Sequence, residues 1–383
     1  MLLSARVTIE PFALERFQSV YEHQVEINLS ESGVEPLRLG DLLAPDELDR
    51  LVREPLGYTQ TNGTAELREL VAADYPGASA ENVLITTGCA EANFLTCWRL
   101  VEPDDEVVVL HPNYLQTHLL AHAHGARVVP WRLRLTGGST VRWAPALDEL
   151  RTMVSDRTRL VVLCNPNNPT GARLTAAEID EVCAVAAGHG AWVLSDEVYR
   201  GAERDGVLTA SAWGRYERTV VTSGLSKVYG LPGLRIGWVV APPAMCEELW
   251  SRRDFTTIAP AALSDRVARL ALAPDSRDRL RARAQQRVAE HYAVVREWIA
   301  GTGAGLAHVP PEAGAIVFLG YPHAIGSEEL ATTLRETASV LVAPGAYFGL
   351  DGYLRIGFGE SEAPLRTGLG RLEHLLTRLP QPA

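Results

Sequence analysis

The chain has 383 residues, of which 46% are hydrophobic and 22% charged, and its formal net charge is −11 at pH 7. This composition is typical of a globular protein with more than one hydrophobic core, and the acidic balance argues against nonspecific binding to nucleic acids or anionic membranes. We expect neither a membrane span nor a signal peptide. The five cysteines form no CxxC pair, which argues against a disulfide framework or a zinc site and favours a cytoplasmic location.

Short apolar runs alternate with helical patterns through the middle of the chain. Each of seven runs is typical of a buried strand, and they occupy residues 82–88, 105–112, 127–133, 159–166, 191–197, 218–224 and 235–242. Continuous apolar strands joined by helices indicate a buried, mainly parallel sheet. We therefore predict a large α/β domain over residues 45–272, with its ligands at the carboxyl ends of the strands.

The two ends of the chain are expected to form smaller structures. Residues 275–300 predict one long helix with a basic outer face, which we interpret as a solvated face rather than a nucleic-acid surface. The apolar segments that follow predict a smaller α+β domain over residues 273–383. Residues 1–44 contain a short helix and a polar turn, and are expected to join this smaller domain or to reach a partner subunit.

Backbone amides at one predicted strand end could bind a phosphate. The sequence TTGCAEA places Gly88, Cys89 and Ala90 between a strand and a helix. Exposed amides at a helix N-terminus bind phosphate through hydrogen bonds and the helix dipole. Many strand–helix turns contain glycine, so a plain turn is the alternative.

Two further strand ends carry polar side chains. In NPNNPTG, two prolines and a glycine fix a loop that presents Asn168, although the same residues favour a plain turn. In SDEVY, Asp196 ends another apolar strand, and Tyr199 follows three residues later. A carboxylate at a buried strand end needs a cation or several donors to offset its desolvation, unless it only caps the next helix.

The segment SGLSKVYGLPGLRIGW is almost uncharged, yet it contains Lys227 and, eight residues later, Arg235. A partly desolvated lysine is an amine nucleophile that can form a Schiff base, and arginine suits a phosphate. In YLRIGFG, Arg355 could clamp a carboxylate or form an internal salt bridge. Pyridoxal phosphate together with an amino acid would supply a binding partner for each of these groups. The pair offers an aldehyde, a phosphate, a ring nitrogen and a carboxylate.

The order and spacing of NPNNPTG, SDEVY, SKVYGLPGLRIGW and LRIGFG resemble those of the fold-type I, pyridoxal phosphate-dependent class I/II aminotransferase family. The resemblance runs over nearly the whole chain, from YTQTNGTAELRELVA onward. It implies an α/β fold with a mainly parallel seven-stranded sheet in the large domain and a smaller α+β domain. It also implies amino acid and 2-oxo acid substrates, no metal, and a homodimer with shared active sites.

Position by position, the resemblance implies roles in binding the cofactor. Lys227 would form the Schiff base and move the Cα proton, and Asp196 would pair with the pyridine nitrogen. Tyr199 and Asn168 would hydrogen-bond the ring hydroxyl, and Tyr114 would stack on the ring. The phosphate would be held by Gly88, Cys89, Ala90, Ser226 and Arg235.

The resemblance also implies contacts with the partner subunit and the substrate. Tyr58 would reach the phosphate of the neighbouring subunit, and Arg355, with Gly33 and Asn168, would bind the substrate carboxylate. One position departs from the family pattern. Three residues before the lysine the family usually carries serine or threonine on the phosphate, whereas this chain has Gly224, and we expect Ser223 to substitute from one position earlier.

The segments SESGVEPLRLGDLL, GLPGLRIGW, RRDFTTIAP and VLVAPGAYFG look closest to the capreomycidine synthase-like branch of the family. This branch handles arginine-derived, guanidino-bearing amino acids in peptide-antibiotic pathways. The intact SDEVY favours transamination, for instance of 2-ketoenduracididine with an amino donor. A cyclase or eliminase acting on a hydroxyarginine is the alternative.

Two other hypotheses carry less weight. A regulatory protein that retains the aminotransferase fold as a ligand sensor would need a DNA-binding domain ahead of the fold, and the first 45 residues leave no room for one. His118 and His122 have the i, i+4 spacing of metal ligands on a helix, but no third ligand of suitable type lies close in the sequence. We therefore expect an enzyme without a metal site.

Overall fold

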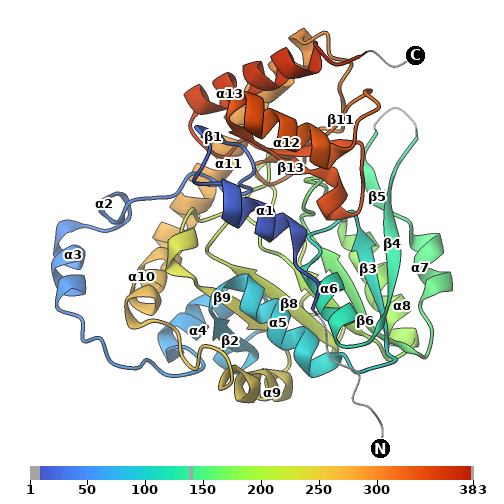
Figure 1. Cartoon of the computed structure of the whole chain (residues 1–383). Coiled ribbons are helices and arrows are strands. Elements are labelled where there is room, and N and C mark those ends of the chain that lie inside the picture. Colours follow the sequence, from blue (N-terminus) through green and yellow to red (C-terminus); the bar gives the residue numbers. More distant parts are fainter. Residues whose placement is uncertain (1–8, 138–140, 381–383) are drawn as a thin grey trace, which may run out of the picture.

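The computed structural model describes residues 9–137 and 141–380, and Figure 1 shows them arranged around a large sheet in one half and a smaller sheet in the other. The large sheet has the strand order β2-β9-β8-β7-β6-β3-β4-β5. Its strands are β2 (Val83–Thr86), β3 (Glu106–His111), β4 (Arg127–Leu135), β5 (Trp143–Pro145), β6 (Thr158–Cys164), β7 (Trp192–Asp196), β8 (Thr219–Gly224) and β9 (Gly237–Val240).

The seven predicted strands are all present, and the sheet is mainly parallel as predicted. Strands β8, β7, β6, β3 and β4 run parallel, whereas β9 is antiparallel to both of its neighbours. The predicted strand count was wrong by one. The short β5 pairs antiparallel with β4 at the edge of the sheet and makes an eighth strand. A segment of three residues is too short for its hydrophobic pattern to indicate a strand from the sequence.

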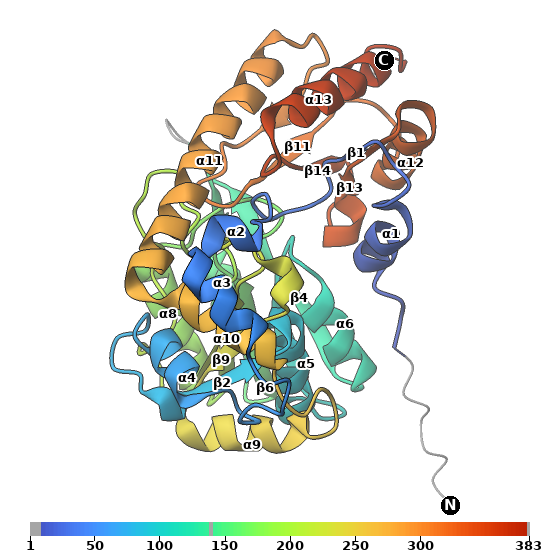
Figure 2. The ribbon, with the colours of Figure 1, turned by 90° about the vertical axis from the view of Figure 1, so that its left-hand side faces the viewer.

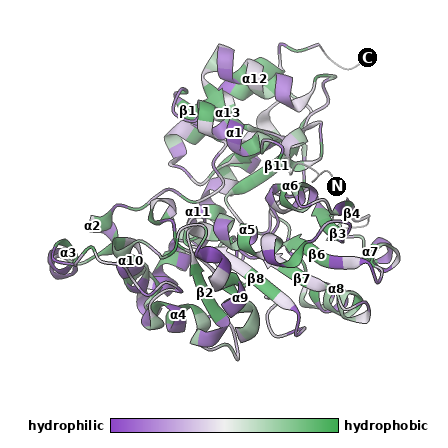
Figure 3. Cartoon of the chain, turned by 60° about the horizontal axis from the view of Figure 1, so that its bottom comes forward, coloured by the Kyte–Doolittle hydropathy of each residue, from purple (hydrophilic) through white to green (hydrophobic). Residues whose placement is uncertain are grey.

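Helices cover both faces of the large sheet. Alternate side chains of β3 enter different hydrophobic clusters, with Val108 and Leu110 on one face and Val107 and Val109 on the other. Figure 3 shows the resulting concentration of hydrophobic residues in strands such as β2 and β6. The covering helices are α4 (Ala65–Ala72), α5 (Gly88–Leu100), α6 (Gln116–Ala123), α7 (Leu147–Met153), α8 (Ala176–Gly188), α9 (Pro243–Arg253) and α10 (Ala262–Leu272).

The predicted long helix is α11 (Pro274–Gly301), which runs along one side of the molecule from the large half to the small half (Figure 2). The small half contains an antiparallel sheet of order β10-β11-β14-β13. Its elements are β10 (Ala307–His308), β11 (Ile316–Gly320), α12 (Ser327–Ala338), β12 (Val340–Leu341), β13 (Ala343–Pro344), β14 (Tyr353–Gly357) and α13 (Glu362–Leu376).

The N-terminal residues pack on the small half and then cross to the large one. Strand β1 (Ile27–Asn28) pairs in parallel with β12, and α1 (Ala13–Tyr21) lies between the two halves in Figure 1. Helices α2 (Leu39–Leu42) and α3 (Pro45–Val52) protrude beside α10, and α3 buries none of its residues. The domain boundaries after residues 44 and 272 stay predictions. Within the described ranges, no helix has the length and apolar character needed to cross a membrane.

Candidate active site

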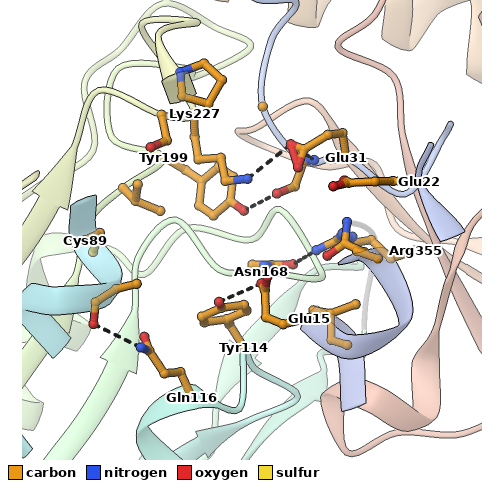
Figure 4. A pocket seen from close by; sticks show the side chains of 18 of the residues that line it. Glu15, Glu22, Glu31, Cys89, Tyr114, Gln116, Asn168, Tyr199, Lys227 and Arg355 are labelled. Carbon is orange, nitrogen blue, oxygen red and sulfur yellow. Dashed lines mark hydrogen bonds and ion pairs between the residues drawn. The ribbon is translucent and has the colours of Figure 1, made fainter. Parts of the chain in front are cut away.

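A cavity of about 600 Å³ lies at the carboxyl ends of the central strands, beneath α1 (Figure 4). This volume suits a small organic ligand. Eleven of the residues predicted from the sequence line it, although they come from distant parts of the chain. They are Gly33, Cys89, Ala90, Tyr114, Asn168, Asp196, Tyr199, Ser226, Lys227, Arg235 and Arg355.

Lys227 lies in the turn after β8 and points into the cavity. Its Nζ atom is 3.3 Å from Oε2 of Glu31, and its side chain is only 24% exposed. Lys227 is also the only lysine among the 383 residues. The other basic residues counted with it are all arginines. The cavity therefore holds the one side-chain amine of the chain, and this compositional fact alone could have singled out the residue.

Asp196 ends β7 with its carboxylate toward the cavity. Its Oδ2 accepts a hydrogen bond from Asn93 Nδ2 at 3.0 Å, and its Oδ1 accepts one from the backbone N–H of Val198 at 3.1 Å. Burial raises the pKa of Asp196 despite these donors. The carboxylate therefore lacks a cation close enough to offset its desolvation, and a protonated nitrogen on a ligand would supply one.

The start of α5 and the Arg235 guanidinium form one anion-binding corner. Thr87 makes no side-chain capping bond to this helix, so its first amides are open to a ligand. Gly88 has a φ of +76°, and a Cβ atom there would collide with Nη2 of Arg235. Arg235 Nη1 also donates to Ser226 Oγ at 3.3 Å. A helix N-terminus beside a guanidinium and a hydroxyl suits a phosphate.

The structure explains the departure at Gly224. A Cβ atom at this position would lie 2.9 Å from the backbone oxygen of Ile236, so the close approach of β9 favours glycine. The prediction that Ser223 replaces the missing hydroxyl was wrong. Its Oγ donates to the backbone oxygen of Glu197 at 3.2 Å, outside the cavity, because successive residues of a strand point to opposite faces.

Arg355 lies on β14 in the small half and is only 1% exposed. Its Nη1 donates to Asn168 Oδ1 at 2.9 Å, and its Nη2 donates to the backbone oxygen of Ser30. Its buried Nε has no hydrogen-bond partner among the described residues. Tyr199 approaches the same region and donates to Ser32 Oγ at 2.9 Å. This buried guanidinium suits a ligand carboxylate better than an internal salt bridge, because no carboxylate of the described chain pairs with it directly.

The two remaining tyrosines have different positions. Tyr114 lines the cavity and donates its hydroxyl to Glu15 Oε1 of α1 at 2.7 Å. Tyr58 does not line this cavity. It lies on the segment between α3 and α4, where its side chain is 90% exposed. Its predicted role involves a second subunit and stays a prediction.

Sequence reasoning missed several polar residues of the site. Asn93 lies one helical turn after Cys89 on the same face of α5, and this spacing could have identified it. Glu15 lines the cavity from α1, and Glu22 and Glu31 line it from the segment that follows this helix. No local pattern marks these three carboxylates, because only the fold brings the N-terminal segment over the cavity.

The arrangement fits pyridoxal phosphate in three respects. A single amine faces the cavity, a buried carboxylate lacks a cation, and a helix N-terminus with Arg235 offers an anion site. The guanidinium of Arg355, which lines the same cavity, suits a substrate carboxylate. These residues can together bind a phosphorylated aldehyde and an amino acid, and can move a proton at the lysine amine.

Comparisons with known proteins agree with this chemistry. The family model for aminotransferase class I and II matches residues 48–372. The chain is 34% identical to a capreomycidine synthase of Streptomyces vinaceus, over 92% of this chain and 90% of that protein. It is 30% identical to an arginine–pyruvate transaminase of Pseudomonas aeruginosa, over 85% and 84%. The crystal structure of a PLP-dependent aminotransferase from Streptococcus suis superposes with a TM-score of 0.90 at 30% identity, over 98% of this chain and 100% of that chain.

Proposed function

Because the chain belongs to the class I and II aminotransferase family and uses pyridoxal phosphate, we propose that it transfers the amino group between a guanidino-bearing amino acid and a 2-oxo acid. An arginine-derived substrate such as 2-ketoenduracididine, in cytoplasmic antibiotic biosynthesis, is the specific proposal. One observation carries it. The same cavity holds the single lysine, the buried Arg355 and the carboxylates of Glu15, Glu22 and Glu31, which suit the amino, carboxylate and guanidinium ends of such a molecule.

The bound cofactor supplies an aldehyde that captures the amino group and a ring that withdraws electrons from the substrate Cα. We assign the phosphate to the α5 N-terminus with Cys89, Ala90, Ser226 and Arg235. The carboxylate of Asp196 holds the proton on the ring nitrogen, which offsets the desolvation that now raises its pKa.

The remaining residues orient the substrate and move its proton. Arg355, oriented by Asn168, binds the α-carboxylate through its guanidinium, and Gly33 also lines the cavity. Tyr199 would hydrogen-bond the ring hydroxyl, and Tyr114 would stack on the ring. Lys227 Nζ would take the proton from the substrate Cα and hold it for return, so the same amine would serve both half-reactions.

Incubation of the PLP-loaded protein with guanidino amino acids and pyruvate tests this function. We expect alanine and the matching guanidino 2-oxo acid in equal amounts, measured by mass spectrometry. A Lys227→Ala protein under the same conditions is the control. If the loaded wild type transfers no amino group from any guanidino amino acid but does so from neutral ones, the proposed substrate class is wrong.

A second candidate is favoured by the similarity to a capreomycidine synthase. In that case the protein would remove water from a hydroxyarginine and close a ring, without any 2-oxo acid. Incubation with hydroxyarginine alone distinguishes the two reactions. Loss of one water to a cyclic amino acid supports the cyclase, whereas conversion only after addition of pyruvate supports the transaminase.

The proposed assembly is a homodimer with shared sites. The segment from α3 to Tyr58 protrudes and exposes apolar side chains, with Val52 87% and Leu56 79% exposed. Burial of such residues against a second copy would be favourable. A Tyr58→Phe protein should bind the cofactor more weakly than wild type if its hydroxyl reaches the partner's phosphate, and unchanged affinity would contradict this role.

A further inference from the structure

The N-terminal strap, residues 29–35, is fixed on both sides of the cavity. Gly357 of β14 donates its backbone N–H to Leu29 at 2.7 Å, and Val34 donates to the backbone oxygen of Lys227 at 3.0 Å. Its two ends are thus tied to the small sheet and to the turn that holds the lysine. The backbone position of Glu31, midway along the strap, is therefore set by the fold.

The carboxylate of Glu31 lies in the cavity between two cations. Its Oε2 is 3.3 Å from Lys227 Nζ, and the charges of Lys227 and Arg355 hold the pKa of Glu31 below its usual value. Figure 4 shows the side chain pointing from the strap toward the lysine, with Arg355 on the other side. The two positive charges that compensate Glu31 therefore belong to Lys227 and Arg355, which are the proposed Schiff-base lysine and the proposed carboxylate-binding arginine.

We propose that Glu31 is the specificity-determining residue that selects a substrate with a cationic side chain, through a hydrogen bond from that cation to its carboxylate. The inference rests on the proposed function, in which the Lys227 nitrogen bonds to the cofactor and Arg355 binds the α-carboxylate. Both cations are then engaged, and Glu31, whose side chain is 42% exposed, keeps its negative charge beside the bound substrate without either of its former partners. A guanidinium or ammonium on the substrate compensates this charge, whereas a neutral side chain leaves it unpaired.

The other carboxylates of the cavity are less suited to this role. Glu15 already accepts the hydroxyl of Tyr114 at 2.7 Å. Glu22 Oε1 lies 3.4 Å from Nε2 of the exposed His23, so it already has a neighbouring polar group outside the two cations. Burial raises the pKa of Glu360 and so favours its neutral form. Among these four described carboxylates, Glu31 is the one that lies within 3.3 Å of Lys227 Nζ.

The test measures binding of two unreactive analogues to the PLP-loaded protein by calorimetry. Guanidinopentanoate and ureidopentanoate are arginine and citrulline without the α-amino group, so neither can react with the cofactor. We expect wild type to prefer the cationic analogue by at least about tenfold, the value of one charge-assisted hydrogen bond. Glu31→Gln should reduce this preference to about threefold or less, with its cofactor absorbance and melting temperature confirming that it folds.

Glu35→Gln is the matched control. This carboxylate lies on the same strap but pairs with Arg287 at 2.8 Å outside the cavity, so the wild-type preference should persist. A wild type without preference, or a preference that survives in Glu31→Gln, would overturn the inference. A third outcome separates the two proposals. If the wild type transfers no amino group but Glu31→Gln still loses the preference for the cationic analogue, only the proposed function is wrong.

Discussion

The two walls of the cavity hold their carboxylates in opposite electrostatic states. On the wall formed by the large sheet, burial raises the pKa of Asp196, because no cation lies close enough to offset its desolvation. On the wall formed by the N-terminal segment, Lys227 and Arg355 lower the pKa of Glu31. The first wall therefore lacks a compensating charge until a ligand binds, whereas the second wall compensates its charge internally.

Lys227→Ala removes the amine that pairs with Glu31 across the cavity and should have the largest effect. We expect amino transfer to fall by about 10⁴-fold or more, because the variant lacks both the nucleophile and the proton carrier. The visible absorbance of the Schiff base should disappear from protein given pyridoxal phosphate. Since Lys227 is the only lysine, borohydride reduction of wild type followed by peptide mapping should label no other side chain, and a band that persists in the variant would contradict the assignment.

Asp196→Asn should separate the two walls by their response to pH. The folded pKa of Asp196 lies above its ordinary value of 3.8, so the apo protein loses stability as pH rises above about 4. The amide variant lacks this loss and should melt higher than wild type at neutral pH without cofactor. With cofactor, its amino transfer should fall by about 100-fold or more, because the ring nitrogen loses its anionic partner.

Glu31→Gln provides the opposite pH comparison. Its folded pKa lies below the ordinary value of 4.5, so the carboxylate stabilises the apo protein above that pH and the stabilisation is lost as pH falls below it. The melting temperature of wild type should therefore exceed that of the variant at neutral pH and converge with it in acid. Melting curves of both variants from about pH 2 to 8 check the two signs. If both variants changed the melting temperature with pH in the same direction, the electrostatic contrast between the walls would be wrong.

The same contrast explains what the sequence could predict. The large-sheet wall is built from strand ends whose polar residues follow apolar runs, so Asp196, Asn168 and Lys227 could be found locally. The N-terminal wall depends on the pairing of β1 with β12, more than 300 residues apart in the chain, and no spacing indicates that Glu15 or Glu31 reaches the cavity. The prediction for Ser223 failed for a different physical reason. Side chains alternate along β8, so Ser223 and Gly224 face opposite sides of the sheet.

Gly224→Ser tests the large-sheet wall by restoring the residue type usual in the family. The added Cβ would lie 2.9 Å from the Ile236 backbone oxygen, so we expect a loss of about 1–3 kcal/mol in the free energy of unfolding. Ser223→Ala is its counterpart and removes only the bond to the Glu197 backbone, costing about 1 kcal/mol. Chemical denaturation measures both, and cofactor affinity in Ser223→Ala should match wild type. Weaker cofactor binding there would place the hydroxyl on the phosphate after all.

Tyr114→Phe should have the smallest effect, because it breaks only one of the hydrogen bonds that cross between the two walls. The Tyr114 hydroxyl donates to Glu15 of α1 at 2.7 Å, and Phe12 packs edge-on against the same ring with centroids 4.8 Å apart. Phenylalanine keeps the ring and its packing, so α1 should lose about 1 kcal/mol of docking energy and the KM for the amino acid should rise about fivefold with little change in kcat. Glu15→Gln retains an acceptor at the same place and should change KM less. If Tyr114→Phe lowers kcat instead, the hydroxyl acts in the chemical step, and α1 does more than close the cavity over the substrate.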